Sequence, residues 1–389
     1  MNFVGIFRIL EQRSHSCLSL LNIVLTNATD IFAGGEDYVL ILARYLARRG
    51  HTVHISANPG HLLLRKSEEE GIPTLPILYT GMDRVFAVGR ELRGHLRKMR
   101  VDIVHSNANY DRTAAAIAAA FLPARHVAGV HSSHSIQHNI THWIRNRYGI
   151  DHFIADADSV QRVLVDEDGI APERITVIPI GVEPGPSAGR KALRARARAA
   201  LGVSDDTVVI GNLARLVPFK GHRVLLDAAA LVVRVRNNIL VPIAGDGELL
   251  EELKEQARKL GIERQVRFLG FCDNLDELYA GFDVYCHSSL ELAAEAFPLA
   301  ILRALAAGLP VVCTNVGGIA LMVEDGVNGF LRPPDDSASL ADALLKVLAD
   351  PLMRASMGQA SFALFERKYH AARMAETMEK VYESVCPRS

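Results

Sequence analysis

Short apolar runs alternate with amphipathic segments along most of the chain. In the first half, runs rich in β-branched residues predict buried strands at 21–25, 52–56, 102–105, 126–130, 152–155 and 175–178. Segments with a helical period, such as 36–49 and 113–122, lie between them. This alternation predicts a parallel sheet with helices on both of its faces.

The same alternation begins again after residues 182–189, which are rich in Pro and Gly and predict a linker. A basic, Ala-rich helix is expected at 190–201, and strands are expected at 207–211, 239–244, 265–269, 283–286 and 309–313. We therefore predict an α/β protein with two Rossmann-like domains that face each other across a cleft. The ligands of open α/β sheets bind at the carboxyl ends of the strands, so the candidate site lies in that cleft.

The restart of the pattern also sets the expected domain limits. Residues 1–20 are predicted to be an N-terminal extension, 21–184 the first domain and 185–365 the second. A helical tail is expected from 351 to 383, and 366–389 is treated as a separate C-terminal helix.

The composition limits the class of protein. With 389 residues, of which 49% are hydrophobic and 22% charged, the chain is expected to be globular and large enough for two domains. A net charge of −1 gives no basic field, so no nucleic-acid partner is expected. Five scattered Cys without a CxxC pair favour a reducing cytosol over a zinc or disulfide framework. No apolar run is long enough for a transmembrane helix, so a cytoplasmic protein is expected.

Two cations follow the strand expected at 207–211. Arg215 and Lys220 lie in a loop at the carboxyl end of that strand. Fixed cations of this kind stabilise the charge of a departing diphosphate without a metal ion. Taken alone, the pair is equally compatible with two solvated loop charges.

Glycines follow three other strands. Gly34 and Gly35 follow the first strand, and Gly317 and Gly318 follow the strand expected at 309–313. Each pair opens a helix, where backbone N–H groups can bind an anion, although many such turns carry Gly for packing alone. Gly245 begins a Gly-Asp-Gly turn that either shapes a ligand pocket or simply turns the chain. A full G-x-G-x-x-G motif is absent, which argues against a dinucleotide-dependent dehydrogenase.

An acid and a histidine complete the candidate site. Glu295 lies on a turn before an apolar helix that breaks at Gly308, and a strand follows directly. His131 follows the strand expected at 126–130, where a His can orient hydroxyl groups or share protons near neutral pH.

Two further patterns resemble metal sites. His134, His138 and His142 are four apart and would line one helix face, but no acid or thiol nearby in the sequence completes a ligand set. Asp156 and Asp158 mimic the D-x-D motif of metal-dependent transferases. The segment 154–165 resembles one in which the position of Asp158 caps the next helix, so Asp158 is expected to do so here and no metal site is predicted.

Taken in order, these features resemble the family 4 glycosyltransferases, which have the GT-B fold. The resemblance covers about residues 21–365 and is carried by Gly34-Gly35, His131, the run 177–182, Arg215, Lys220, Gly245, Glu295 and Gly317-Gly318. It implies transfer of a sugar from a nucleotide-diphosphate sugar, with retention of the anomeric configuration and without a metal ion or other cofactor. The donor would bind the C-terminal domain, and the acceptor would bind mostly the N-terminal domain.

The resemblance also implies a role for each catalytic candidate. Arg215 and Lys220 would neutralise the diphosphate leaving group. Glu295 would hold sugar hydroxyls and support the positive charge that develops on the sugar. His131 would contact the sugar from across the cleft.

Other residues would then bind the donor. Gly245 would shape the nucleotide pocket, and Phe268 and Leu269 would cup the base largely through their backbone. The glycine pairs at 34–35 and 317–318 would bind phosphate or the donor sugar.

The sequence departs from the family pattern at three places. Arg303 stands where the family has a second Glu that grips ribose hydroxyls. Because Arg cannot accept a hydrogen bond, ribose would be held differently, and Arg303 would instead pair with Glu295 or touch a phosphate. Ile180 replaces the usual Asn before Gly181, and residues 320–321 replace a Pro-Glu pair. These departures keep open a second hypothesis, a catalytically silent GT-B protein that binds a nucleotide sugar or a partner, and a third, nucleotide-sugar epimerisation.

A glycan or lipid-linked acceptor is expected, as in the synthesis of a bacterial-type surface polysaccharide, lipopolysaccharide or glycolipid. The basic segments 90–100 and 190–198 could sit on anionic lipid headgroups, and Phe3, Phe7 and Leu10 would share a helix face. Solvated basic faces and a frayed extension are the simpler interpretations. Contact with the inner face of the membrane is therefore an additional hypothesis for a cytoplasmic protein.

Overall fold

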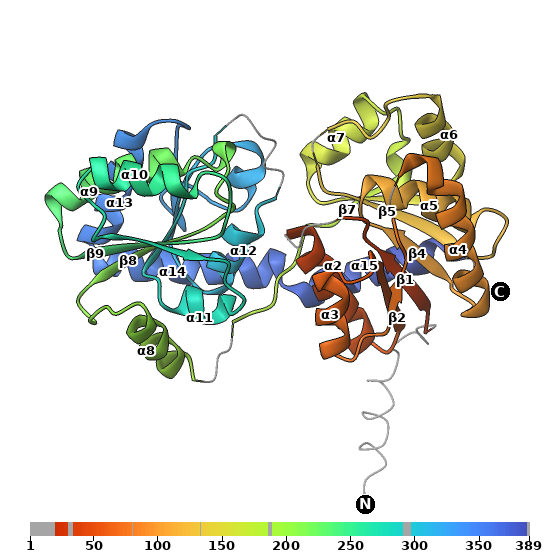
Figure 1. Ribbon diagram of the computed structural model, residues 1–389, viewed down its shortest axis with the longest axis horizontal. Helices are drawn as coiled ribbons and strands as arrows, with labels where there is room; N and C mark the ends of the chain where they lie inside the picture. The colour runs from red at the N-terminus through yellow and green to blue at the C-terminus, as the bar shows by residue number, and fades with distance from the viewer. Residues whose placement is uncertain are drawn as a thin grey trace, which may run out of the picture.

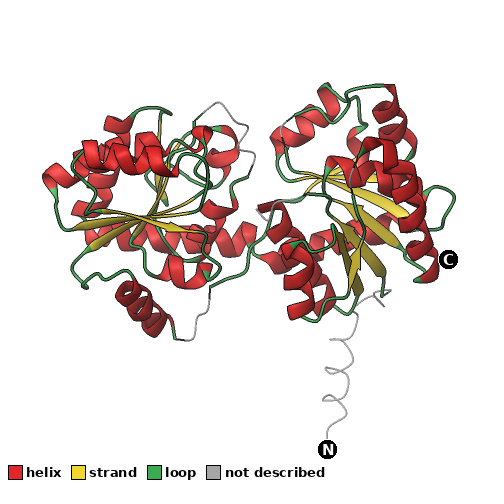
Figure 2. Cartoon of the chain, viewed as in Figure 1, coloured by secondary structure: helices red, strands yellow, loops and turns green. Residues whose placement is uncertain are grey.

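The computed structural model describes residues 20–29, 34–79, 81–132, 134–185, 189–290 and 297–386. Within these ranges the chain forms two α/β bodies, each with a sheet between layers of helices (Figure 2). The predicted extension, apart from residue 20, lies outside the described residues, and so does Glu295.

The N-terminal body contains a parallel sheet with the strand order β3-β2-β1-β4-β5-β6-β7. Its strands are β1 (Asn22–Thr26), β2 (Thr52–Ala57), β3 (Thr74–Pro76), β4 (Ile103–Ser106), β5 (Arg125–Val130), β6 (His152–Ala155) and β7 (Ile175–Val177). Its helices are α2 (Gly34–Arg48), α3 (Leu62–Glu69), α4 (Val85–Lys98), α5 (Asn109–Ala119), α6 (Ile140–Tyr148) and α7 (Asp158–Asp166). Every residue of β4 is buried, as expected for a central strand that is covered on both faces.

The C-terminal body repeats this design with the strand order β10-β9-β8-β11-β12-β13. Its strands are β8 (Val208–Leu213), β9 (Ile239–Ala244), β10 (Val266–Gly270), β11 (Val284–His287), β12 (Val311–Thr314) and β13 (Gly329–Arg332). Its helices are α8 (Arg190–Ala200), α9 (His222–Val235), α10 (Leu250–Lys259), α11 (Leu275–Ala280), α12 (Leu299–Ala306), α13 (Ser337–Ala349) and α14 (Pro351–Leu364). The two sheets place the carboxyl ends of their strands toward a common cleft.

The predicted strands are all present, within one or two residues of their expected limits. The apolar pattern does not predict β3 and β13, which are short and contain Pro or Gly. The helix expected at 113–122 lies earlier, as α5, because Asp111 accepts a hydrogen bond from the backbone N–H of Ala108 and fixes its start. Phe121 is outside this helix, with a left-handed φ of 59°.

The tail from residue 351 is not one continuous helix. After α14 the chain makes a π-helical turn at Phe365–Tyr369 and then forms α15 (Ala371–Val385). Helix α15 packs on α2 of the N-terminal body, where the blue end of the chain lies among red and orange elements (Figure 1). The buried carboxylate of Glu379 pairs there with His51, at 2.8 Å, and with Arg49. The last helix in the sequence therefore completes the first domain.

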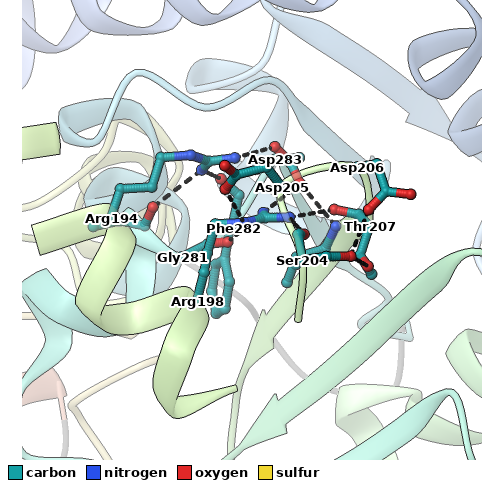
Figure 3. A network of polar contacts seen from close by, with 11 residues as sticks. Arg194, Arg198, Ser204, Asp205, Asp206, Thr207, Gly281, Phe282 and Asp283 are labelled. Atoms are coloured by element: carbon teal, nitrogen blue, oxygen red, sulfur yellow. Dashed lines mark hydrogen bonds and ion pairs between the residues drawn. The ribbon is translucent and has the colours of Figure 1, made fainter. Parts of the chain in front are cut away.

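Helix α8, which follows the linker, is attached to the C-terminal sheet by two arginines (Figure 3). Arg198 is 3% exposed and donates hydrogen bonds to the carbonyl oxygens of Ser204, at 2.6 Å, and Thr207. Its guanidinium also lies 3.2 Å from the carboxylate of Asp283, which Arg194 contacts as well. Since Asp283 directly precedes β11, these contacts anchor α8 to the amino ends of the strands, away from the cleft.

Candidate active site

A cavity of about 680 Å³ lies between the two bodies and is lined by residues from both. Residues that follow the carboxyl ends of β1, β5 and β6 line it from one sheet, and residues that follow β8, β9 and β10 line it from the other; α3 and α12 also contribute. The structure brings together these residues of the predicted site: Gly34, Gly35, His131, Arg215, Lys220, Gly245 and Arg303. Four predicted residues do not line the cavity: Phe268, Leu269, Gly317 and Gly318.

The loop after β8 carries both predicted cations. Lys220 ends a 3₁₀ turn, and its ammonium lies 5.5 Å from the ring centre of Phe219, which Arg215 faces at 5.8 Å. Ser288, after β11, donates a hydrogen bond to the carbonyl oxygen of Lys220 at 3.1 Å. Gly221 has a left-handed φ of 66°, and a side chain there would meet the Ser288 carbonyl oxygen at 1.9 Å. This close backbone packing holds the two cations at the cavity wall.

Gly245 fixes the same loop from its other side. Its φ is 130°, and its backbone N–H donates to the carbonyl oxygen of Gly270 at 2.8 Å. A Cβ at Gly245 would lie 2.0 Å from the carbonyl oxygen of Ala214, the residue before Arg215. Glycine is therefore required here for a close approach of two backbones, as well as for its conformation.

Gly245→Ala is expected to lower kcat/KM for the reaction at this cavity by about tenfold or more, because a small displacement of positioning residues is costly for catalysis. The methyl group would push the 214–215 backbone away from the cavity. Steady-state kinetics on the purified variant measure the change in kcat/KM. Gly261→Ala is the matched control, because Gly261 has a φ of 71° with no atom within 4 Å of the added Cβ. Equal activity of the two variants would contradict the positioning role.

His131 stands on the opposite wall, directly after β5. Its ring meets that of Tyr38 edge-on, with 4.7 Å between the ring centres. Its Nδ1 lies 3.5 Å from Oδ2 of Asp156, a carboxylate that is only 2% exposed. Burial raises the pKa of the Tyr38 hydroxyl above its usual range, and the charge of Asp156 adds to the rise. Both ring nitrogens of His131 are buried and make no hydrogen bond with the described residues, so Asp156 contacts the imidazole at ion-pair distance only.

Asp156 and Asp37 are cavity residues that the sequence analysis did not assign to the site. Asp156 follows β6 just as His131 follows β5, so its place at a strand end was a usable signal. Asp37 is in the first turn of α2, two residues after Gly35, and only the fold brings it near the second domain.

Arg303 forms an ion pair with Asp37 across the cleft. The sequence analysis expected a partner in Glu295 or a phosphate; the structure provides a carboxylate of the other domain. Burial alone would lower the pKa of Arg303. The negative charge of the adjacent Asp37 has the larger effect, and the pKa of Arg303 is raised. Lys66 and Asp273 form a second ion pair between the bodies, at 3.0 Å, and both line the cavity.

The two metal-like patterns have other structures. Helix α6 begins only at Ile140, because Asn139 is its cap. His138 therefore lies before the helix and His142 lies within it, so the prediction that these histidines line one helix face is wrong. The cap of α7 is Ala157, without a side-chain hydrogen bond, so the predicted capping role of Asp158 is also wrong. Asp158 lies in the first turn, where a negative charge favours the helix dipole. Among the described residues, no three His, Cys, Asp or Glu are arranged to hold a metal ion.

Comparison with known protein families identifies both halves of the chain. The family described as "Glycosyltransferase Family 4" matches residues 32–185, and the family described as "Glycosyl transferases group 1" matches residues 194–363. The chain belongs to these glycosyltransferases.

Curated relatives that the chain matches are named as glycosyltransferases. This chain is 36% identical over 220 residues to the D-inositol 3-phosphate glycosyltransferase of Saccharomonospora viridis. The matched segment is 54% of this chain and 50% of the relative. This chain is also 35% identical over 170 residues to the phosphatidyl-myo-inositol mannosyltransferase of Mycobacterium leprae. That matched segment is 43% of this chain and 44% of the relative. The matched part of the chain spans about half the length of the curated relatives.

Solved structures confirm the predicted GT-B fold of this chain. A Rickettsia africae glycosyltransferase has a TM-score of 0.83 with 19% identity, over 95% of this chain and 100% of that one. The HepE protein of Anabaena, solved in complex with UDP, has a TM-score of 0.80 with 23% identity, over 94% of this chain and 100% of that one. In the part of the chain that the structure describes, no helix is long and apolar enough to span a membrane.

Proposed function

We propose that this chain transfers a glycosyl group from a nucleotide-diphosphate sugar to a hydroxyl group of a glycan or lipid-linked acceptor, with retention of the anomeric configuration. The observation that carries the proposal is the placement of Arg215 and Lys220 on a rigid loop in a cavity between two domains. A pair of fixed cations in such a site is suited to binding a diphosphate and to stabilising it as it departs.

The names of similar proteins support a sugar donor of this class. One relative is named as a mannosyltransferase, and HepE structures contain UDP, glucose or UDP-glucose. A cavity of about 680 Å³ is of the size that encloses a small organic ligand. His131 faces the cations across that space, so a sugar attached to the bound diphosphate would lie between the two walls.

We propose further that the reaction needs no metal ion. Arg215 and Lys220 would supply the positive charge that a divalent cation supplies in other transferases. Glu295 stays a predicted catalytic residue, and the ion pair of Arg303 with Asp37 would lie beside the nucleotide. The retained sugar configuration and the acceptor are parts of the same proposal.

A thermal-shift screen against UDP, GDP, ADP and their common sugars, with and without EDTA, tests donor binding. A ligand that binds only the native state raises the melting temperature, and saturation at about a hundredfold over Kd stabilises it by about 2.7 kcal/mol. We expect one nucleotide to give a clear rise that EDTA does not change. A rise that disappears with EDTA would contradict the metal-independent mechanism. No rise with any nucleotide would contradict donor binding and favour a catalytically silent protein.

A further inference from the structure

Helix α6 of the N-terminal body shows its apolar side chains to solvent. Ile140, Trp143, Ile144 and Tyr148 are all exposed, Tyr148 at 74% and Ile140 at 66%. Their spacing places them on one face of the helix, together with Arg147. A surface helix normally turns such a face toward the core, so this arrangement is the reverse of the usual one. We call these four residues the α6 patch.

The buried residues of α6 are polar, namely Arg145 and Asn146. Arg145 is 5% exposed and donates hydrogen bonds to the carbonyl oxygen of Ile136, at 3.0 Å, and to Thr113, at 3.1 Å. Burial lowers the pKa of Arg145 to about 9, and the neighbouring charge of Arg112 contributes. Asp168 accepts hydrogen bonds from the backbone of the same loop, including Ile136 at 3.0 Å. The orientation of α6 is therefore fixed by a buried polar network, and its apolar face stays outside as part of the fold.

The neighbouring helices also carry exposed aromatic and basic groups. Helix α4 packs on α5, and α5 packs on α6, so the three cover one region of the N-terminal body (Figure 1). Phe121, two residues after α5, is fully exposed although its φ of 59° is unfavourable for a bulky residue. Helix α4 exposes Phe86 near its start and the basic residues Arg90, Arg97 and Lys98 farther along. Exposed acids are few on these helices, and α6 has none.

The α6 patch is also connected to the catalytic cleft. Strand β5 ends at Val130, His131 lines the cavity, and α6 begins nine residues later, at Ile140. A groove lined by Gln137, Asn139, Ile140 and Trp143 lies at the start of this helix. The amino end of the patch therefore lies on the side of the domain where the cleft opens.

We propose that the α6 patch docks on the surface of an anionic lipid bilayer. Apolar side chains that include Trp and Tyr, with Arg and Lys beside them, form the combination that binds the interface of such a bilayer. The apolar groups enter the headgroup region while the cations attract the negative surface, with about fivefold in affinity for each cation. Docking of the α6 patch on a bilayer goes beyond the proposed transfer reaction. It would bring a lipid-linked acceptor to the mouth of the cleft.

The basic helix expected at 190–198 is not available for this role. Arg194 and Arg198 are bound to Asp283, and Arg196 pairs with Glu277. These three arginines are thus used within the C-terminal body, whereas the exposed cations of α4 and α6 lie on the domain that carries the α6 patch.

The single Trp of the sequence, Trp143, lies within the α6 patch and makes the test direct. We would record its fluorescence with vesicles of phosphatidylcholine alone and of phosphatidylcholine mixed with phosphatidylglycerol, and we would measure binding by co-sedimentation. Docking predicts a blue shift with the anionic vesicles and quenching by lipids that carry bromine on their acyl chains. The double variant I140S/I144S is expected to bind about tenfold or more weakly.

Leu352→Ser is the matched control, because Leu352 is 83% exposed on α14 of the other body and its loss should leave vesicle binding unchanged. Nucleotide-induced thermal shifts of I140S/I144S should equal those of the wild type, which separates this proposal from the donor site. Emission from Trp143 that does not change with either vesicle would overturn the proposal. So would a lipid-free dimer that I140S/I144S dissociates, since a second copy would then cover the patch.

Discussion

Lys220→Ala is expected to reduce kcat/KM for glycosyl transfer by about 10²–10³-fold, the usual effect of removing one fixed group that stabilises developing negative charge. Lys220 is on the loop that the Ser288 hydrogen bond and Gly221 hold against the end of β11. A replacement by Ala removes the charge but leaves this backbone packing in place. The melting temperature without ligand should therefore change little, while the rise caused by the nucleotide diphosphate should be lost.

Two controls make the Lys220 experiment specific. Lys254→Ala removes an exposed lysine of α10 that pairs only with its helix neighbour Glu251 among the contacts observed, and it should leave kinetics unchanged. Nucleosides that lack the diphosphate should bind Lys220→Ala as they bind the wild type. A variant with reduced activity and an intact diphosphate-dependent thermal shift would assign Lys220 a role other than binding the leaving group.

Arg198→Ala is expected to lower the free energy of unfolding of the C-terminal domain by about 3–5 kcal/mol, because it removes one partner of a buried ion pair. The change would leave the Ser204 and Thr207 carbonyl oxygens without their donor and would leave the Asp283 carboxylate less well paired (Figure 3). Urea unfolding followed by circular dichroism measures the loss as a lower transition midpoint.

The neighbouring Arg196 provides the comparison for Arg198. It is on the same helix and pairs with Glu277 in solvent, so Arg196→Ala should leave the midpoint nearly unchanged. If both variants unfolded at the same urea concentration, the buried network would not be the attachment of α8. Donor binding by folded Arg198→Ala should persist, since this network lies away from the cleft.

The sheets and the loops after their strands could be predicted because each depends on local pattern. Buried strands such as β9 are continuous apolar runs, and a parallel sheet places the following loops at one edge. This is why His131, Arg215 and Gly245 meet at one cavity, as the sequence suggested. Strand β3 was missed because a three-residue segment ending in Pro has no periodicity to detect.

The rest of the site depends on contacts that no local pattern records. Asp37 and Arg303 are 266 positions apart and form their ion pair only because α2 and α12 face each other across the cleft. The reversed burial of α6 is a similar case, since a helical period reveals an apolar face but not the direction in which it points. Arg145 faces inward because the surrounding loop offers it carbonyl oxygens, and those positions are set by the tertiary structure.

The position of α15 has a consequence for how the protein is made. Residues leave the ribosome in sequence order, so α2 and its sheet emerge long before the helix that covers them. Until then, His105 lacks the hydroxyl of Tyr382, which it meets at 2.6 Å in the finished domain, and His51 lacks the carboxylate of Glu379. The N-terminal domain must therefore remain incomplete while the whole C-terminal domain is synthesised. A nascent chain stalled before α15 would expose an apolar groove, and chaperones would be expected to hold the first domain rather than the second.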